Sequence, residues 1–259
     1  MKDFNYKKKY GQNFLVDDNV KQKIFESISP QREDLIIEIG PGKGALTTYL
    51  KKYDVSLIGI EVDNDTKDYL SKLENNKTKF IFNDFLKIDI NELLKDITYN
   101  NLFFVGNLPY YITTPIIEKI IDSSFSNATI VVMVQKEVAE RFLAKPHTRN
   151  YGYITVLLNY YYNISKVVDA KKECFYPIPK VDSMVVKLTP KNKKENINID
   201  DFKLFLKNAF KYKRKNLKNN LNGYDLNKIQ KCLEKNNYSL NNRAEEIDLD
   251  TFIDLYNNL

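Results

Sequence analysis

Short apolar runs and amphipathic segments alternate along the first three quarters of the chain. Five runs have the length and composition of β-strands, at residues 35–39, 55–60, 78–82, 102–105 and 128–134. Segments with apolar residues at helical spacing follow several of them, and Asp17 or Asp18 is placed to cap a first helix that ends at Pro30. Alternating strands and helices predict an α/β domain with a mostly parallel sheet.

The pattern changes after a polar, lysine-rich linker at residues 190–198. Before it, an aromatic-rich helix is predicted at 151–162 and an alternating strand at 183–188. After it, only helical periodicity is found, in the segments 201–212, 226–235 and 249–259, with a short helical turn at 243–246. We therefore predict an α/β domain over residues 1–190 and a small all-helical domain over residues 191–259.

A glycine-rich loop, residues 40–44, joins the first predicted strand of the sheet to a helix. Glycines let the backbone approach a bound group that a Cβ atom would keep away, and Gly40 and Gly42 are the candidates here. Glu61 ends the next strand about 20 positions later, where an acidic residue can hold ribose hydroxyls. The loop alone fits a tight turn without a ligand equally well. Together with Glu61 it predicts a nucleotide-type cofactor.

The segment Asn107-Leu108-Pro109-Tyr110 follows the apolar run at 102–105. Pro109 cannot continue a central strand, so Asn107 and Tyr110 are expected at the carboxyl end of a strand, where open α/β sheets bind ligands. An amide oxygen can accept a hydrogen bond from the amino group of a base, and a ring can stack on that base. A turn with a packed tyrosine is the simpler interpretation of these four residues alone.

Two further residues are candidates for the same site. Asp84 follows the strand at 78–82 and could accept a hydrogen bond from an adenine amino group, although acidic loop residues are commonly just solvated. Phe175 precedes a stiff, proline-rich segment. It could form a second wall for a base or pack in the core, and this stretch favours neither interpretation.

Composition narrows the class of protein. The 259 residues include 40 basic and 34 acidic side chains, a formal net charge of +6, so the location of the basic residues matters more than their excess. Two cysteines and one histidine suggest neither a disulfide framework nor a metal site. No apolar run has the length of a membrane span and no signal peptide is recognised. We expect a cytoplasmic protein without a membrane partner, and a monomer.

Basic residues are concentrated between positions 203 and 218, where no acidic residue occurs. Phe205, Phe210 and Tyr212 interrupt this run, which favours contact with a phosphate backbone over a solvated face. The candidate RNA-binding residues are Lys211, Lys213, Arg214, Lys215 and Lys218. The N-terminal arm, residues 1–16, is also basic and aromatic and is a second candidate for RNA contact.

Taken in order, several motifs resemble those of the small-subunit ribosomal RNA adenine dimethyltransferases, which use S-adenosylmethionine. The resemblance runs from Gly11 to about Asn220 and rests on Gly11-Gln12-Asn13-Phe14-Leu15, Glu38-Ile39-Gly40-Pro41-Gly42, Asn107-Leu108-Pro109-Tyr110, and residues 135–141 and 175–183. A sister family, which methylates one adenine of large-subunit RNA and confers macrolide resistance, usually has Ile after Asn107 and lacks the run at 135–138. Leu108 and the basic motif at 213–217 therefore favour the small-subunit family.

The resemblance implies a Rossmann-like class I methyltransferase fold, with a mostly parallel seven-stranded sheet and helices on both faces. It implies S-adenosylmethionine as the cofactor. The matching cofactor-binding positions are Asn13, Leu15, Gly40, Gly42, Glu61, Asp84 and Asn107. In this assignment Glu61 holds the ribose and Asp84 the adenine of the cofactor.

The implied catalytic residues are Asn107, Leu108, Tyr110 and Phe175. The Asn107 amide oxygen and the Leu108 carbonyl would accept the two hydrogens of an adenine N6, and Tyr110 and Phe175 would enclose the base. The implied reaction adds two methyl groups to each of two adjacent adenines near the 3′ end of small-subunit (16S) ribosomal RNA, in a partly assembled subunit. No role is implied for His147, whose loop departs from the family, or for Tyr111, where the family often has Asn.

Three alternatives remain open from the sequence. The first is a large-subunit (23S) adenine methyltransferase of the macrolide-resistance type. The second is an RNA-binding ribosome-assembly factor whose methylation is secondary or lost. The third is a nicotinamide-dependent oxidoreductase that uses the glycine loop, but it leaves the Asn-Leu-Pro-Tyr motif and the basic run unexplained.

Overall fold

A computed structural model describes residues 13–123, 125–191 and 197–259, which form two compact units. The sheet unit comprises Met1–Ala139 and Ile164–Pro190, and the helical unit comprises Glu140–Asn163 and Lys191–Leu259. This grouping differs from a single division at residue 190, because apolar side chains from Glu140–Asn163 pack in the core of the helical unit. The predicted RNA contacts of the N-terminal arm fall largely on residues 1–12, outside the described residues, as does most of the linker.

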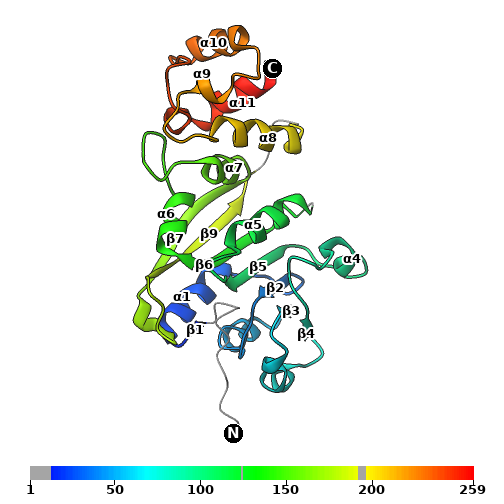
Figure 1. Ribbon diagram of the computed structural model, residues 1–259. Helices are drawn as coiled ribbons and strands as arrows, with labels where there is room; N and C mark the ends of the chain where they lie inside the picture. The colour runs from blue at the N-terminus through cyan, green and yellow to red at the C-terminus, as the bar shows by residue number, and fades with distance from the viewer. Residues whose placement is uncertain (1–12, 124, 192–196) are drawn as a thin grey trace. The chain divides into compact units, whose positions relative to one another are not determined.

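The described part of the sheet unit contains a seven-stranded sheet with the strand order β4-β3-β2-β5-β6-β9-β7 (Figure 1). Its strands are β2 (Leu35–Ile39), β3 (Ser56–Glu61), β4 (Thr78–Phe82), β5 (Leu102–Asn107), β6 (Thr129–Gln135), β7 (Tyr162–Ala170) and β9 (Ser183–Pro190). Strands β2 to β6 pair in parallel, and β9 is antiparallel to β6. The predicted mostly parallel seven-stranded sheet is therefore confirmed.

The central strands are continuous apolar runs because helices and loops cover them. Every residue of β2 is buried, and Leu35, Ile36 and Ile37 have no exposed surface. Strand β7 was not predicted, since only its first and last residues are buried and its sequence alternates weakly. The short strands β1 (Phe14–Leu15) and β8 (Phe175–Tyr176) form a separate antiparallel pair, and two residues give no periodic signal.

The helices that begin in the sheet unit are α1 (Asp18–Ile28), α2 (Thr47–Leu50), α3 (Lys67–Leu70), α4 (Ile90–Leu94), α5 (Thr113–Asp122) and α6 (Lys136–Phe142), whose last residues belong to the helical unit. Aspartate side chains cap α1 and α4. Asp17 caps α1, since its carboxylate accepts a hydrogen bond of 2.9 Å from the Val20 amide. Helices α2 and α3 are short, and 3₁₀ turns flank them.

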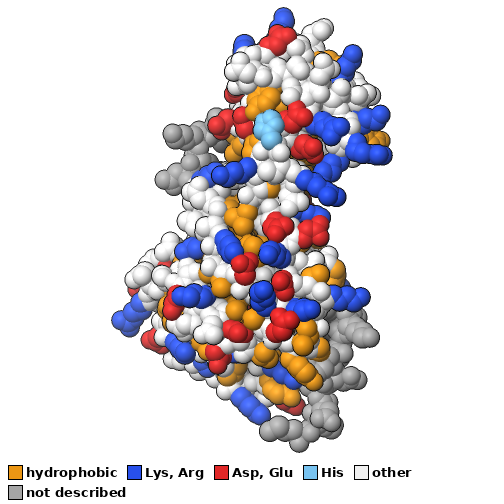
Figure 2. Space-filling view, turned by 90° about the vertical axis from the view of Figure 1, so that its left-hand side faces the viewer, with side chains coloured by type: hydrophobic (Ala, Val, Ile, Leu, Met, Phe, Trp, Pro, Cys, Tyr) orange, Lys and Arg blue, Asp and Glu red, His pale blue; other side chains and the backbone are white. Residues whose placement is uncertain are grey.

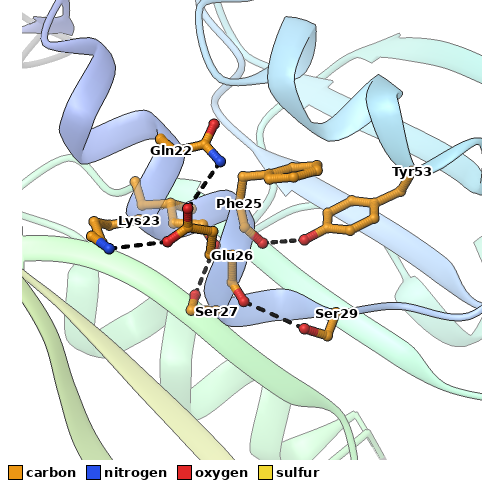
Figure 3. Close-up of polar contacts among 8 residues, drawn as sticks. Gln22, Lys23, Phe25, Glu26, Ser27, Ser29 and Tyr53 are labelled. Carbon is orange, nitrogen blue, oxygen red and sulfur yellow. Dashed lines mark hydrogen bonds and ion pairs between the residues drawn. The ribbon is translucent and has the colours of Figure 1, made fainter.

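The last turn of α1 is fixed to the turn that follows α2 (Figure 3). The rings of Phe25 and Tyr53 stack with their centroids 4.0 Å apart, and the Tyr53 hydroxyl donates to the Phe25 carbonyl. That carbonyl lies in the last helical turn, where the helix offers it no amide partner. The helix ends at Ile28, one residue before Ser29 takes a left-handed conformation.

The helical unit has its own apolar core, formed by residues such as Phe202, Phe205, Leu206 and Phe252. Its helices are α7 (Tyr153–Tyr161), α8 (Ile199–Ala209), α9 (Leu217–Asn220), α10 (Leu226–Lys235) and α11 (Leu249–Asn257). Helix α8 ends at Ala209 and not at the predicted Tyr212, so most of the basic run lies in the turns between α8 and α9. Within the part of the chain that the structure describes, no helix could cross a bilayer.

Candidate active site

The carboxyl ends of three parallel strands meet at one pocket. Ile39 at the end of β2 is in register with Ile60 of β3 and with Gly106 of β5. The residues that follow in each strand, Gly40, Glu61 and Asn107, therefore emerge side by side at the edge where such sheets bind ligands. The open pocket has an empty volume of about 520 Å³. Its lining residues are Asn13, Phe14, Gly40, Gly42, Glu61, Val62, Asn107, Leu108, Pro109 and Tyr110.

The glycine loop takes a backbone conformation that side chains disfavour. Gly40 and Gly42 have φ angles of 67° and 60°. A Cβ atom on Gly42 would lie 2.6 Å from the Phe14 ring, so this glycine is required for Phe14 to cover the loop. A Cβ atom on Gly40 would meet nothing within 4 Å, so the chain leaves open space there.

Glu61 joins the loop to β3. It is 5% exposed, and its two carboxylate oxygens accept hydrogen bonds of 2.8 Å from the amides of Gly42 and Asp63. Burial raises the pKa of this carboxyl group. A carboxylate has about four acceptor positions, so Glu61 can accept ligand hydroxyls as well as hold the loop.

Asn107 is oriented by a contact from a distant part of the chain. Its amide nitrogen donates a hydrogen bond of 2.8 Å to the main-chain carbonyl of Asn13. A carbonyl can only accept, so the NH₂ group must face Asn13, and the amide oxygen is the atom left to accept hydrogen bonds from a ligand. This bond also ties the segment before β1 to the end of β5.

Tyr110 and Leu108 contribute different groups to the pocket. The Tyr110 hydroxyl and Ser183 Oγ form a hydrogen bond of 3.1 Å, which holds the half-buried ring at the start of β9, and burial raises the pKa of this hydroxyl. The Leu108 side chain is 1% exposed, and its amide donates to the Met133 carbonyl at 3.0 Å. The role predicted for Leu108, acceptance of a hydrogen bond from the target amine, belongs to its main-chain carbonyl. Burial of the side chain does not conflict with that role.

Three predicted site residues do not line the pocket. Asp84 lies just beyond β4, whose Phe82 is in register with Glu61, and its carboxylate accepts a hydrogen bond of 3.0 Å from the Leu86 amide. Leu15 and Phe175 are partners across β1 and β8 and are 4% and 1% exposed in the core of the sheet unit. The Phe175 ring therefore presents no exposed face to a base in this arrangement.

Glu38 is a polar residue near the site, and no role was predicted for it from the sequence. It is 1% exposed in the middle of β2, and its carboxylate accepts a hydrogen bond of 2.6 Å from the Thr47 hydroxyl at the start of α2. Burial raises its pKa to about 8. An ionisable residue inside an otherwise apolar strand was the feature of the sequence that could have identified Glu38. Phe14, Val62 and Pro109 also line the pocket without having been predicted.

The five candidate RNA-binding residues of the basic run are all exposed. The Lys213 ammonium donates a hydrogen bond of 2.6 Å to the Arg149 carbonyl, which joins the basic run to the loop at residues 145–150. Lys145 and Arg149 of this loop are exposed as well and enlarge the basic surface. Figure 2 shows a group of Lys and Arg side chains to one side of the single histidine, with Asp and Glu side chains next to the histidine itself. Arg149 lies 64 residues from Lys213, so this contact could not be predicted from the sequence.

Comparison with known proteins identifies the family. The profile of the family described as Ribosomal RNA adenine dimethylase matches residues 3–259. The ribosomal RNA small subunit methyltransferase A of Mycoplasma mobile is 40% identical over 96% of this chain and 96% of that protein. The protein of the same name from Clostridioides difficile is 40% identical over 98% of this chain and 91% of that protein.

Solved structures agree with this assignment. A dimethyladenosine transferase from Plasmodium falciparum is 26% identical, with a TM-score of 0.76 over 93% of this chain and 95% of that one. The 23S rRNA methyltransferase ErmE shares the fold, with a TM-score of 0.73 and 22% identity over 95% of this chain and 99% of that one. The chain therefore belongs to the ribosomal RNA adenine dimethylase family.

Proposed function

We propose that this protein transfers methyl groups from S-adenosylmethionine to N6 of adenines in small-subunit ribosomal RNA, two for each adenine. The observation that carries the proposal is the orientation of Asn107, whose amide oxygen remains as a hydrogen-bond acceptor beside the glycine loop and Glu61. An acceptor fixed in this way suits an amino group as the nucleophile. The names of the two relatives described above support the small subunit as the source of the RNA.

The pocket fits the proposed cofactor. The open space at Gly40 admits a group that a side chain would exclude, and Glu61 offers carboxylate oxygens to ribose hydroxyls. Asp84, just beyond the neighbouring strand, is proposed to accept from the adenine amino group. When bound, S-adenosylmethionine supplies a methyl group activated by its attachment to a positively charged sulfur.

The residues of the chain would prepare the target amine. In free adenine the N6 lone pair is delocalised into the ring and does not point toward an incoming methyl group. Acceptance of both N6 hydrogens, by the Asn107 amide oxygen and the Leu108 carbonyl, favours a pyramidal nitrogen with a directed lone pair. The Tyr110 ring would stack on the base, which contributes roughly 1–3 kcal/mol. Phe175 was the second ring predicted for this stacking; its side chain is buried in the core, and this proposal rests on Tyr110 alone.

The RNA would be held mainly through its phosphates. The target base must leave its stack, and unpaired loops allow this at the lowest cost. The basic surface formed by Lys213, Arg214, Lys215 and Arg149 would then fix the position of the RNA without reading its sequence.

The proposal is tested with labelled S-adenosylmethionine and isolated ribosomal subunits that lack the modification, followed by mass spectrometry of the nucleosides. We expect N6,N6-dimethyladenosine in small-subunit RNA only. Label confined to large-subunit RNA would assign the protein to the macrolide-resistance type. Cofactor binding without label in either subunit would instead favour a role in ribosome assembly.

A further inference from the structure

Two tyrosines with exposed rings lie next to residues of the pocket. Tyr111 and Tyr176 are 61% and 58% exposed, among the most exposed large hydrophobic side chains of the described residues. They come from different elements, the turn between β5 and α5 and the strand β8. Neither is needed for the core, and the proposed mechanism uses neither.

The position of Tyr176 follows from the register of β1 and β8. Leu15 pairs with Phe175 and Phe14 pairs with Tyr176. Partners across an antiparallel pair point to the same face, and successive residues point to opposite faces. Because Leu15 and Phe175 point into the core, Phe14 and Tyr176 share the other face. Phe14 lines the pocket, so the Tyr176 ring lies beside it on the pocket side.

The position of Tyr111 follows from a tight turn. The Ile112 amide donates a hydrogen bond of 3.2 Å to the Pro109 carbonyl, which closes a four-residue turn with Tyr110 and Tyr111 at its centre. Tyr110 lines the pocket and is held by Ser183, whereas Tyr111 projects to solvent from the neighbouring position.

The segment that carries Tyr176 is held at both ends. The Asp182 carboxylate accepts a hydrogen bond of 2.9 Å from the Lys172 amide, and the Asp182 carbonyl accepts one of 3.0 Å from the Lys136 amide. Pro177 and Pro179 stiffen the chain between these contacts. A ring on a rigid segment loses little conformational entropy when a ligand stacks on it.

The charges around this segment favour a nucleic acid as its ligand. Lys171, Lys172 and Lys180 are exposed close to Tyr176 in the chain and outnumber the exposed Glu173. Exposed aromatic rings combined with cationic side chains are the pattern that binds unpaired nucleotides, with stacking for the bases and charge for the phosphates.

We propose that Tyr176 and Tyr111 are stacking sites for the unpaired nucleotides that flank the target adenine. This inference rests on the proposed function, in which RNA is the substrate. The two rings would hold the strand on each side of the extruded base, so that the target adenine reaches Asn107. Stacking tolerates any base, so these sites would add affinity without reading sequence.

The test measures equilibrium binding of the full-length protein to small subunits that lack the modification, without cofactor. We expect Tyr176→Ala and Tyr111→Ala each to weaken binding roughly 5- to 100-fold, the equivalent of one lost stacking contact. Tyr→Phe at either position should bind like the wild type, and Tyr→Leu should bind like the Ala variant. The salt dependence of binding should not change, because stacking releases no counterions.

The control variant is Leu204→Ala, which truncates a side chain that is 57% exposed on α8, outside the site. Its affinity for the subunit should equal that of the wild type. Cofactor affinity, measured by calorimetry, should be unchanged in all variants. Since both tyrosine rings are exposed, their truncation should leave the thermal unfolding temperature close to that of the wild type.

Three outcomes would overturn the inference. Wild-type affinity in both Ala variants would show that the rings do not contact RNA, and methylation of the small subunit would still uphold the proposed function. Wild-type affinity in the Leu variants would indicate an apolar contact with a ribosomal protein. A loss confined to cofactor affinity would place the rings on S-adenosylmethionine. Failure of the proposed function is detected separately, as absence of label in small-subunit RNA.

Discussion

The hydrogen bond to the Asn13 carbonyl orients the Asn107 amide. Replacement with Ala removes the acceptor for the target amine, and we expect methyl transfer to fall at least about 100-fold, the scale of an error in positioning. Asn107→Asp keeps the size of the side chain but places an anionic oxygen against the Asn13 carbonyl, so it should also lose most activity. Single-turnover transfer to unmodified small subunits measures both effects.

The binding of RNA serves as the control for these variants. We expect both to bind small subunits with nearly the wild-type affinity, because the phosphates and the neighbouring bases are held elsewhere. Full turnover by Asn107→Ala would exclude Asn107 from the mechanism.

Glu38 makes the stability of the sheet unit depend on pH. Its pKa is raised from 4.5 to about 8 in the folded protein. Between these values the unfolded chain loses this proton and the folded protein keeps it, so the free energy of unfolding falls as the pH rises. Glu38→Gln removes the titration and keeps an acceptor for the Thr47 hydroxyl.

We therefore expect Glu38→Gln to gain stability relative to the wild type as the pH increases. The difference between their thermal unfolding temperatures should be larger at about pH 8 than at about pH 5. The pKa of Glu61 is also raised by burial, and its charge adds to the raised pKa of Glu38, so the difference between the two proteins reports the titration of Glu38 beside Glu61. A difference that does not vary with pH would show that Glu38 titrates normally.

The glycine loop is the element whose geometry most directly shapes the pocket. Gly40 and Gly42 have similar positive φ angles, so an Ala at either position costs roughly 1 kcal/mol of backbone strain. Only at Gly42 would the added Cβ collide with the Phe14 ring. At Gly40 the added methyl group would enter the open space proposed for the cofactor. We therefore expect Gly40→Ala to weaken cofactor binding more than Gly42→Ala, which requires only that the loop and Phe14 move apart.

Calorimetric titration of each variant with S-adenosylmethionine checks this order. The two variants are matched controls for each other, since the strain is shared and the collision is not. An equal or smaller loss in Gly40→Ala would mean that the cofactor does not use the open space at Gly40.

At the scale of the whole molecule, the basic surface of the helical unit should govern the electrostatic part of RNA binding. Replacement of Lys213, Arg214 and Lys215 with Gln removes three charges. If each contacts a phosphate, the slope of log affinity against log salt should become shallower by roughly 2, at about 0.7 for each contact with a single strand. Binding to unmodified small subunits over a range of salt concentrations measures this slope.

A variant with the same change in charge separates contact from general attraction. Lys228, Lys231 and Lys235 are exposed on α10 of the same unit, and their replacement with Gln also removes three charges. We expect this variant to keep the wild-type slope. Equal slopes in both variants would show that the basic run is a solvated face.

Local and periodic features of the chain were predictable from the sequence. The strands β2 to β6 and β9 are apolar or alternating runs, and the glycine loop, Glu61 and Asn107 follow directly from strand ends that meet at one edge of a parallel sheet. The motifs also indicated the family, because each motif is a contiguous stretch of the chain. Strand β7 and the pair β1–β8 were missed, since they are held by contacts with other strands and not by their own periodicity.

Contacts between distant segments were decided by the tertiary structure alone. The Asn13 carbonyl orients the Asn107 amide across 94 residues, and Lys213 reaches Arg149 across 64. The pairing of β1 with β8 turned Phe175 into the core and left Tyr176 exposed beside Phe14. Sequence patterns specify which residues are apolar and how they repeat. Which faces become buried depends on the partners that folding brings together, and a pattern along the chain contains no record of those partners.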